Sequence, residues 1–391
     1  METTTNHLIV GGGMTADAAC KGIRDLDPDG KILLVGDDPH PPYARPPLSK
    51  ALWKGDDEDS VWLGTTDLDV DLRLGRRIVE LDLEARTARD DQGETYAYER
   101  LLLATGGRPR KLPFGGDEVV YYRTFDDYKQ LRSLAADGAS VLVIGGGFIG
   151  SEIAAALAMN DCAVTMIFPE PGIGARIFPA ELSAALVDYY RERGVTVLPG
   201  ATVTGIEWDG AGRVTLEDGR VLETDAVVAG LGIEPGTELA EKAGLPLSNG
   251  IVVDGFGQVG GREDVFAAGD VARFPVPALD GEMRVEHEDH AKSHGRQVGA
   301  NMAGAGQPYE HLPFFYSDLF DLGYEAVGEL DSRLETLTEL GELGEKGLVY
   351  YLDGDRRPRG VLLWNQFGRV DEARELIRAG ASIPQGAGGP L

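Results

Sequence analysis

The stretch HLIVGGGMTA, residues 7–16, decides how this chain is expected to fold. It opens with a short apolar run typical of a buried strand, and the glycines after that run lead into a helix. Gly11 allows a tight turn, Gly13 lets the backbone approach a pyrophosphate, and Ala16 lets helix and strand pack closely. The helix N-terminus would then face the phosphates. The stretch therefore predicts a dinucleotide-binding turn.

The residues after this turn support the same interpretation. Residues 31–35 predict a second buried strand that leads to Asp37, a carboxylate at the right distance to bind ribose hydroxyls. The prolines within residues 42–50 impose an extended course that would lie along the bound cofactor. A Gly-rich turn between two apolar strands, followed by an acidic residue at this distance, favours dinucleotide binding over a plain tight turn.

Composition and length limit the class of protein. With 391 residues, 42% of them hydrophobic, the chain is long enough for more than one domain with its own core. No apolar run approaches the roughly 20 residues that span a bilayer. The first predicted strand begins almost at residue 1, so we expect a cytoplasmic protein without a signal peptide. Cys20 and Cys162 lack CxxC spacing and are expected to be small core residues, which argues against a dithiol reductase.

The charge balance bears on partners. Acidic residues outnumber basic ones 65 to 37, which gives a formal net charge of −28. Binding to nucleic acid through a broad electrostatic surface is therefore excluded as an expected function. An acidic protein partner would need a local basic patch to dock against this background repulsion.

The middle of the chain alternates between strand patterns and repeats the opening motif. Strands are predicted at 78–82, 95–98 and 101–104, the last ending in a turn at Thr105-Gly106 that would return toward the cofactor, and a helix at 126–134. The repeat follows, and its pieces are a strand at 141–144, a GxGxxG turn at 145–150, a helix at 151–159 and a strand at 163–168. Two complete units in one chain predict two bound dinucleotides, a hydride donor and a flavin acceptor.

The carboxylate after the second strand of the repeated unit helps to assign the nucleotide that this unit binds. Glu170 would bond a free ribose 2′-hydroxyl and repel a 2′-phosphate, which favours NADH over NADPH. Two alternatives stay open, because Arg176 could accept a phosphate and Glu170 could be a solvated loop residue.

The second half of the chain continues these patterns and ends in a third domain. A hairpin is predicted over 213–222, a buried strand at 226–229, a loop with a short helix over 235–250 and a helix over 291–302. Between them, a strand over 264–270 ends in Gly269-Asp270, where the Asp could accept bonds from flavin ribityl hydroxyls. The last domain is expected to hold strands at 314–316, 324–330, 348–352 and 361–364, a helix at 370–379 and a frayed tail from 382 to 391.

These motifs identify a family. The chain resembles the apoptosis-inducing-factor-like branch of FAD-dependent pyridine nucleotide oxidoreductases, relatives of the oxygenase-type ferredoxin reductases. The resemblance rests on residues 42–50, 104–106, 145–152, 168–170, 268–270, 284–287, 317–319, 323–328 and 363–365. It implies a glutathione-reductase-like α/β architecture with two Rossmann-like domains and a small C-terminal α+β domain. The implied boundaries are 1–122 with 235–309 for the FAD domain, 123–234 for the NAD domain and 310–391 for the last.

The resemblance also implies the ligands of each cofactor. FAD would be held by Gly11, Gly13, Met14, Thr15, Ala16, Asp37, Arg45, Lys50, Val79, Thr105, Gly106, Arg123, Gly269, Asp270 and His287. NADH would be held by Gly146, Gly147, Phe148, Ile149, Glu170, Arg176, Gly232, Glu286, Tyr316, Glu325 and Asn365.

Five residues are expected to shape the reaction site. In relatives, the residues matching Lys50 and Glu152 pair beside the flavin, and the one matching Phe148 shields it, although Phe148 could equally be a packing side chain. His287 belongs to the flavin site, which we favour over a metal site in this acidic and imidazole-rich segment. Tyr316 stands where close relatives carry a Trp that stacks on nicotinamide, so aromatic stacking is retained.

The sequence thus predicts an NADH-dependent flavoprotein that passes electrons to an unidentified acceptor, a quinone, a ferredoxin or a small oxidant. No side chain need act as a nucleophile, because positioning and electrostatics suffice for hydride transfer. The alternative is a slow NADH-sensing protein whose reduced, nicotinamide-bound form dimerises or recruits a partner. The segment between Leu334 and Leu348 is short where animal relatives carry a long insertion that responds to reduction.

Overall fold

The computed structural model describes residues 3–136 and 138–391, which form two compact units. Unit 1 combines the chain up to Ala44 with Asp59–Arg108 and Glu234–Pro313. Unit 2 combines Arg45–Glu58, Pro109–Ile233 and Phe314–Leu391. The short strands β7 (Gly107–Pro109) and β16 (Ile233–Pro235) contain two of the points where the chain passes between units. The division into three domains by cofactor stays a prediction.

The main sheet of unit 1 is built around the first predicted strand. Its strands are β1 (Thr3–Val10), β2 (Ile32–Gly36), β3 (Val70–Leu74), β4 (Ile78–Asp82), β5 (Thr87–Asp90), β6 (Thr95–Leu103) and β18 (Val265–Ala267). The order is β3-β2-β1-β6, and both β5 and β18 also pair with β6. The strands predicted at 95–98 and 101–104 are one strand, because β6 pairs with β1 from Thr3 opposite Tyr96 to Val10 opposite Leu103.

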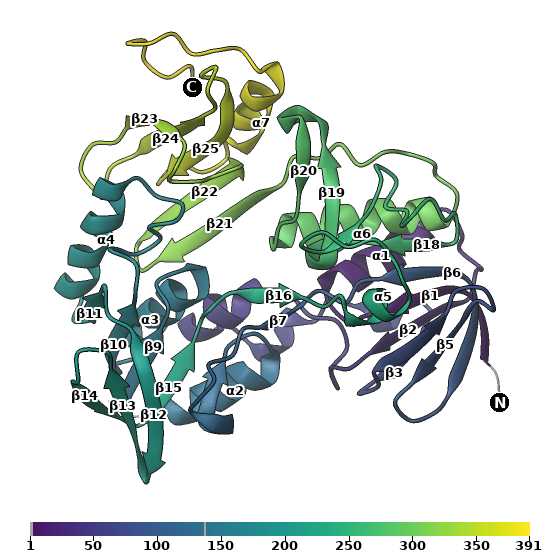
Figure 1. Cartoon of the computed structure of the whole chain (residues 1–391), viewed down its shortest axis with the longest axis horizontal. Helices are drawn as coiled ribbons and strands as arrows, with labels where there is room; N and C mark the ends of the chain where they lie inside the picture. The colour runs from purple at the N-terminus through teal and green to yellow at the C-terminus, as the bar shows by residue number, and fades with distance from the viewer. Residues whose placement is uncertain (1–2, 137) are drawn as a thin grey trace. The chain divides into compact units, whose positions relative to one another are not determined.

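Helices α1 (Met14–Arg24) and α6 (Glu288–Met302) lie side by side against this sheet (Figure 1). They approach so closely that a Cβ on Gly22 would lie 2.1 Å from the Arg296 carbonyl oxygen, and one on Gly299 would lie 2.2 Å from that of Ala19. Only glycine fits at such backbone contacts. The core beneath includes Ile9, Ala16, Ile23, Leu34, Leu102, Phe266, Val298 and Met302.

The remaining elements of unit 1 are short. They are α5 (Glu238–Lys242), β17 (Ile251–Val252), β19 (Ala272–Val276) and β20 (Gly281–Met283). The three strands form a small sheet in the order β17-β19-β20.

Unit 2 contains a parallel sheet in the order β11-β10-β9-β15-β8. Its strands are β8 (Val119–Tyr121), β9 (Ser140–Ile144), β10 (Ala163–Phe168), β11 (Thr196–Pro199) and β15 (Ala226–Ala229), and its helices are α2 (Phe125–Leu134), α3 (Phe148–Met159) and α4 (Ala180–Glu192). An antiparallel sheet joins β12 (Val203–Asp209), β13 (Ala211–Leu216) and β14 (Val221–Thr224). The repeat and the hairpin around Asp218 are as predicted, whereas the prediction contained neither α4 nor β12.

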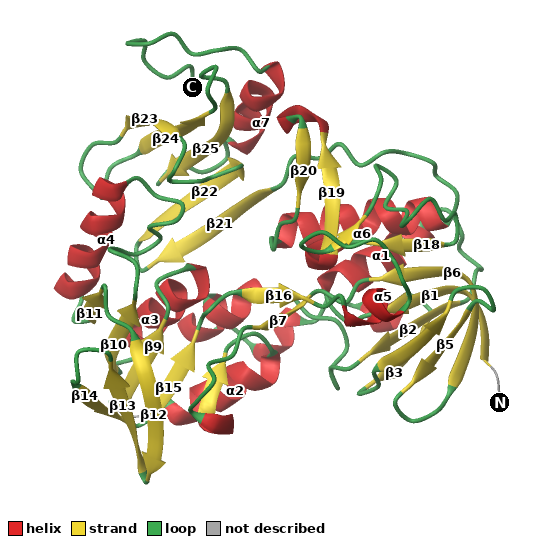
Figure 2. Cartoon of the chain, in the orientation of Figure 1, coloured by secondary structure: helices red, strands yellow, loops and turns green. Residues whose placement is uncertain are grey.

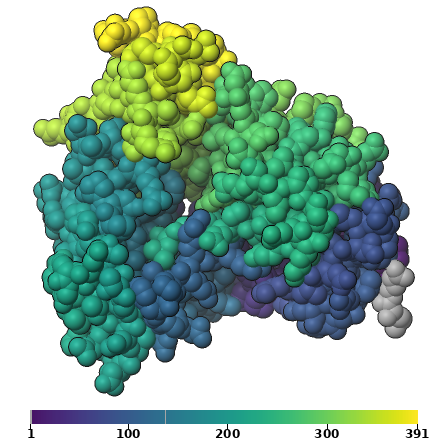
Figure 3. Space-filling model, in the orientation of Figure 1, coloured from purple at the N-terminus to yellow at the C-terminus, as the bar shows by residue number. Residues whose placement is uncertain are grey.

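The C-terminal part of unit 2 is an antiparallel sheet covered by a helix (Figure 2). Its elements are β21 (Phe314–Leu319), β22 (Leu322–Gly328), β23 (Glu335–Glu339), β24 (Gly347–Leu352), β25 (Pro358–Trp364) and α7 (Val370–Ala379). Strand β23 was not predicted. In Figure 3 the lime-to-yellow atoms of this part adjoin the teal atoms of the preceding segment, to which Tyr351 Oη donates a hydrogen bond of 2.6 Å at the Ile177 carbonyl.

The prediction of a frayed tail was wrong. Ile383 is buried, and the Gly389 N–H donates to Glu339 Oε1 at 2.6 Å. The Leu391 N–H donates to the Tyr350 hydroxyl at 3.1 Å. Composition alone predicts disorder here, but one apolar side chain and these backbone bonds fix the tail. Within the described part of the chain, no helix is both long and apolar enough to cross a membrane.

Candidate functional site

The first Gly-rich turn in unit 1 is shaped to admit a ligand backbone. Gly11 has φ 124°, and a Cβ there would lie 2.2 Å from the Ala104 carbonyl oxygen, so only glycine fits. Gly13 caps α1, and a Cβ on it would meet nothing within 4 Å. The N-terminus of α1 thus opens onto free space beside unsatisfied backbone N–H groups, which fits a pyrophosphate. Met14, Thr15 and Ala16 form the first turn of α1.

A second turn of unit 1 packs directly on this one. Gly269 has φ 74°, and a Cβ on it would lie 2.1 Å from Thr15 Oγ1. The structure therefore brings Gly269 and Asp270 beside the start of α1. Thr105 Oγ1 donates to the Gly236 carbonyl at 2.7 Å, and the Gly236 N–H donates to the Gly106 carbonyl at 2.9 Å, which fixes the turn after β6.

Asp37 lies just after β2, as a ribose-binding carboxylate must. Its side chain is 59% exposed and lies 3.5 Å from the Arg77 guanidinium, so it is accessible to a ligand. Asp38, which sequence reasoning did not consider, instead accepts a bond of 2.8 Å from the Tyr43 hydroxyl. Val79 lies on β4.

His287 caps the N-terminus of α6 and keeps partial exposure. Burial lowers the pKa of His287 to about 4, against the opposing effects of Asp270 and Asp289. The ring is therefore neutral near pH 7, and it leaves the N-terminal end of α6 as the source of positive potential. Glu286 pairs with the Arg284 guanidinium at 2.8 Å, and Arg284 also donates to the Asp270 carbonyl at 3.0 Å.

Two further histidines of α6 are buried behind Gly269. His294 Nδ1 accepts a bond of 3.3 Å from the Gly269 N–H, and the His290 Nδ1 lies 3.1 Å from the Tyr309 hydroxyl. Burial lowers the pKa of both rings, to about 3 for His294. No group of three or more His, Cys, Asp or Glu among the described residues is arranged to hold a metal ion.

The second Gly-rich turn, in unit 2, repeats the geometry of the first. Gly145 has φ 118°, and a Cβ there would lie 2.4 Å from the Gly230 carbonyl oxygen. Gly147 caps α3, and a Cβ on it would meet nothing within 4 Å. A methyl group on Gly146 would contact the Phe168 ring at 2.8 Å. Gly232 has φ 79° and its carbonyl accepts from the Arg110 N–H at 2.9 Å. This turn fits a second dinucleotide.

Glu170 and Arg176 are brought together. The Arg176 Nε and NH2 both donate to Glu170 Oε1, at 3.1 and 2.7 Å. Arg176 is 85% exposed and Glu170 is 25% exposed. Both bonds end on the same carboxylate oxygen, and the guanidinium offsets part of the negative charge of Glu170.

The predicted Lys50–Glu152 pair is present in unit 2. Lys50 Nζ lies 2.7 Å from Glu152 Oε1, with side chains 12% and 5% exposed. Ser49 Oγ donates to Glu152 Oε2 and Ser317 Oγ to Glu152 Oε1, both at 2.5 Å. Sequence reasoning assigned no role to either serine, although both lie in stretches that carry the family resemblance, residues 42–50 and 317–319.

Glu152 also acts on the phenols around it. Burial, followed by the negative charge of Glu152, raises the pKa of Tyr190 and Tyr324 far above the usual value. Both phenols are therefore neutral and add no charge beside Glu152. The positive charge next to the carboxylate is that of Lys50.

Three aromatic residues of unit 2, Phe148, Phe315 and Tyr316, lie at the second turn or on the strand that contacts it. Phe148 is 39% exposed and packs edge-to-face on Phe315, with 5.2 Å between ring centroids. Tyr316 is 37% exposed, and Lys50 Nζ lies 5.3 Å from the centroid of its ring. Ile149, next to Phe148, is 37% exposed. Solvent-facing rings at a dinucleotide turn suit stacking on a planar ligand.

Other predicted ligands are held by protein contacts. The Asn365 side chain accepts a hydrogen bond from the Gly323 N–H at 3.0 Å and donates to the carbonyls of Leu343 and Glu345. Its amide oxygen and nitrogen therefore both bond to the protein backbone. Glu325 Oε2 accepts from the Gly368 N–H at 3.0 Å. Two predicted flavin ligands lie at the starts of helices in unit 2, namely Arg45 before the 3₁₀ turn Pro46–Ser49 and Arg123 two residues before α2.

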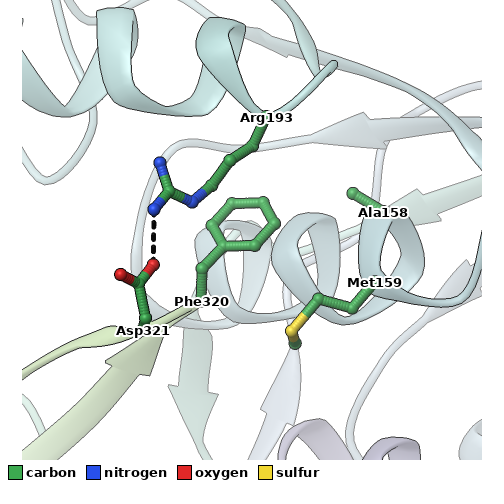
Figure 4. A pocket seen from close by; sticks show the side chains of 5 residues that line it. All are labelled: Ala158, Met159, Arg193, Phe320 and Asp321. Atoms are coloured by element: carbon green, nitrogen blue, oxygen red, sulfur yellow. Dashed lines mark hydrogen bonds and ion pairs between the residues drawn. The ribbon is translucent and has the colours of Figure 1, made fainter.

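A surface pocket of about 400 Å³ lies elsewhere in unit 2 and contains none of the predicted site residues (Figure 4). It is lined by Ala158, Met159, Arg193, Phe320 and Asp321. Arg193 pairs with Asp321 at 2.5 Å, so the charges of the pocket compensate each other.

Comparisons with known proteins agree with this geometry. Residues 5–295 match the family model described as pyridine nucleotide-disulphide oxidoreductase, and residues 298–345 match the C-terminal region of mitochondrion-associated apoptosis-inducing factor. The chain is 33% identical to apoptosis-inducing factor 1 of Dictyostelium discoideum, covering 95% of this chain and 78% of that one. It is 34% identical to the ferredoxin–NAD(+) reductase component of the anthranilate 1,2-dioxygenase system of Burkholderia cepacia, covering 96% and 94%.

A solved structure is similar throughout. The reductase in the covalent putidaredoxin reductase–putidaredoxin complex superposes with a TM-score of 0.89 at 31% identity, covering 96% of this chain and 93% of that one. These similarities confirm the family resemblance and the fold class expected from the sequence.

Proposed function

The chain belongs to the pyridine nucleotide-disulphide oxidoreductase family, whose members use FAD and NAD(H), and we propose that it takes hydride from NADH and passes electrons to a ferredoxin, a quinone or a small oxidant. One observation carries the proposal. Each unit contains a Gly-rich turn whose capping glycine, Gly13 or Gly147, faces open space at a helix N-terminus. Two such cradles suit two dinucleotides.

We assign FAD to the turn of unit 1 and NADH to the turn of unit 2. When bound, FAD supplies the hydride acceptor and stores the electron pair. In unit 1, Asp37 would bind ribose hydroxyls and Asp270 the ribityl chain. In unit 2, Gly147 would admit the pyrophosphate, Glu170 would bind the adenosine ribose, and Tyr316 would stack on the nicotinamide.

The electron path does not use a cysteine pair. Cys20 and Cys162 are free and buried, and burial raises the pKa of both thiols, that of Cys20 to about 12. Neither thiol is a thiolate near pH 7, so neither can act as the nucleophile of a disulfide relay. The electrons therefore pass from the flavin to the acceptor without a protein disulfide.

A second candidate function is the slow NADH sensor, favoured by the match of residues 298–345 to the apoptosis-inducing-factor C-terminal model. In that function the reduced, nicotinamide-bound form would persist and would dimerise or recruit a partner. We propose a cytoplasmic location, although two relatives are named as mitochondrial.

An anaerobic titration of the FAD-loaded protein with NADH tests the proposal. We expect flavin absorbance to bleach, and rapid recovery on adding air, quinone or ferredoxin supports the reductase. A lasting long-wavelength band in air supports the sensor. Absence of bleaching would contradict hydride transfer altogether.

A matched pair of variants tests the assignment of the NADH cradle. Gly147→Ala places a methyl group in the space reserved for the ligand, without a clash inside the protein. We expect it to bind FAD normally but to need at least about ten-fold more NADH for half-bleaching. Gly354→Ala adds a methyl group in equally open space far along the chain and is the control. Equal NADH requirements in the two variants would exclude the Gly147 turn.

A further inference from the structure

Glu152 gathers three donors from two other segments of unit 2. It lies on α3, while Ser49 ends the 3₁₀ turn Pro46–Ser49, Lys50 follows it, and Ser317 lies on β21. Glu152 and the two serines that donate to it, Ser49 and Ser317, are each at most 6% exposed. A buried carboxylate with this many donors is held in one orientation, because any rotation would leave a donor unsatisfied.

The two oxygens of Glu152 serve different partners. Oε2 accepts only the Ser49 hydroxyl among the described bonds, whereas Oε1 accepts both the Ser317 hydroxyl and Lys50. Ser317 and Lys50 thus meet at one oxygen atom. Loss of the Ser317 hydroxyl would free Oε1 to move with Lys50.

Lys50 connects this oxygen to an aromatic ring. Its Nζ lies 5.3 Å from the centroid of Tyr316, within the range of a cation–π contact. Tyr316 directly precedes Ser317 on β21, where neighbouring side chains point to opposite faces. Ser317 therefore anchors the strand on the buried side, and Lys50 contacts the ring that faces solvent.

Residue Phe315 links the same strand to the NADH cradle. Its ring packs edge-to-face on Phe148, the first residue of α3 after the capping Gly147. The strand that carries Tyr316 is thus in contact with the second Gly-rich turn at one end of α3 and with Glu152 one turn further along.

We propose that Ser317 is a positioning residue that holds the Tyr316 ring in place for the nicotinamide, through the shared Glu152 oxygen and Lys50. The proposal rests on the proposed function, because it takes the nicotinamide to stack on Tyr316. Ser317 itself is 1% exposed and is therefore inaccessible to a nucleotide. It fixes the geometry of residues that a nucleotide can reach.

The test separates the nicotinamide end of the ligand from the rest. NAD⁺ and ADP-ribose share the adenosine and pyrophosphate groups, and only NAD⁺ carries the nicotinamide. We would titrate the oxidised, FAD-loaded protein with each ligand by calorimetry. We expect Ser317→Ala to weaken NAD⁺ binding roughly five-fold and to change ADP-ribose binding by less than about two-fold.

Two variants calibrate this result. Thr224→Val removes another buried hydroxyl of unit 2, one that donates to the carbonyls of Ser140 and Ala226, and should leave both affinities unchanged. Ser317→Thr keeps the hydroxyl on a strand that accommodates β-branched residues and should restore NAD⁺ binding. If Ser317→Ala does not fold, Ser317→Cys keeps the volume with a weaker donor and takes its place.

Two outcomes would overturn the proposal. One is unchanged NAD⁺ affinity in Ser317→Ala, and the other is an equal loss of NAD⁺ and ADP-ribose affinity, which would indicate general damage to unit 2. Failure of the proposed function is seen separately, as absence of flavin bleaching when the wild-type protein is titrated with NADH.

Discussion

Removing the cation from the buried Lys50–Glu152 pair should destabilise unit 2 measurably. In Lys50→Met, the Glu152 carboxylate stays buried with only the Ser49 and Ser317 hydroxyls as donors. Breaking a buried pair typically costs about 3–5 kcal/mol, and the two hydroxyls place this variant near the lower end, at about 3 kcal/mol. The pair is 12% and 5% exposed, so solvent screens it little.

The partner substitution completes a double-mutant cycle. Glu152→Gln keeps an oxygen that can accept from Lys50 but removes the negative charge, and we expect a cost of about 2 kcal/mol. In Lys50→Met with Glu152→Gln no charge is left buried. The double variant should therefore lose about 3 kcal/mol and not the summed ~5, a coupling free energy of about 2 kcal/mol.

Urea unfolding of the FAD-loaded protein, followed by circular dichroism and extrapolated linearly to water, measures these free energies. Lys54→Met is the matched control, because Lys54 lies four residues away and its Nζ is 3.6 Å from Asp318 in an exposed pair. That pair should contribute at most about 0.5 kcal/mol. Additive losses in the cycle, or a Lys54→Met loss as large as that of Lys50→Met, would refute the reasoning.

Three other predictions concern pH, coenzyme choice and the first cradle. Burial lowers the pKa of His294 to about 3, while an unfolded histidine titrates near 6.5, so below pH 6.5 the unfolded chain binds a proton that the folded chain does not. Folding stability should fall by about 2 kcal/mol for this group between pH 6.5 and 5, and unfolding measured across that range in His294→Gln should show a shallower slope. Glu170→Gln should improve kcat/KM for NADPH relative to NADH by about ten-fold, whereas Glu181→Gln, at an exposed position of α4, should not. Steady-state kinetics with both coenzymes measure this ratio, and an unaltered ratio in Glu170→Gln would show that Glu170 is only a loop residue. Gly13→Ala should fold yet lose FAD, whereas Gly11→Ala, whose methyl group would meet the Ala104 carbonyl, should give little soluble folded protein. The absorbance of co-purified flavin and circular dichroism separate the two effects. Retention of FAD by Gly13→Ala would count against the first turn as the FAD-binding site.

Much of the fold followed from local patterns. The Gly-rich turns at Gly11 and Gly145 were predictable because their conformations exclude every side chain, and the apolar runs beside them are continuous where strands are buried on both faces. Helix α4 and strand β23 were not predicted, because neither is marked by a motif, and β23 in particular is mostly exposed and polar. Strand β6 was divided in two because Glu99 and Arg100 interrupt its apolar pattern.

The Gly-rich turns of the site were predictable from the sequence. The residues that are brought together by contacts between distant parts of the chain were less so. The Lys50–Glu152 pair came from family resemblance, since no local pattern relates residues so far apart in sequence. The hydroxyl donors Ser49 and Ser317 have no periodic signal, because their bonds to Glu152 form only when the 3₁₀ turn Pro46–Ser49 and β21 pack on α3. Asn365 illustrates the converse. An asparagine could bind a nucleotide, but the amide of Asn365 bonds instead to the backbone of Gly323 and Leu343.

The glycine contact between α1 and α6 has a consequence for biosynthesis. The two helices meet at the backbone, yet Gly22 and Arg296 are separated by most of the chain. At about 5–20 residues per second, a ribosome makes α1 roughly 15–55 seconds before α6 emerges. Throughout that interval Ala16, Ala19 and Ile23 lack the neighbour that covers them. The nascent polypeptide thus carries α1 with the face that packs on α6 uncovered for most of its synthesis.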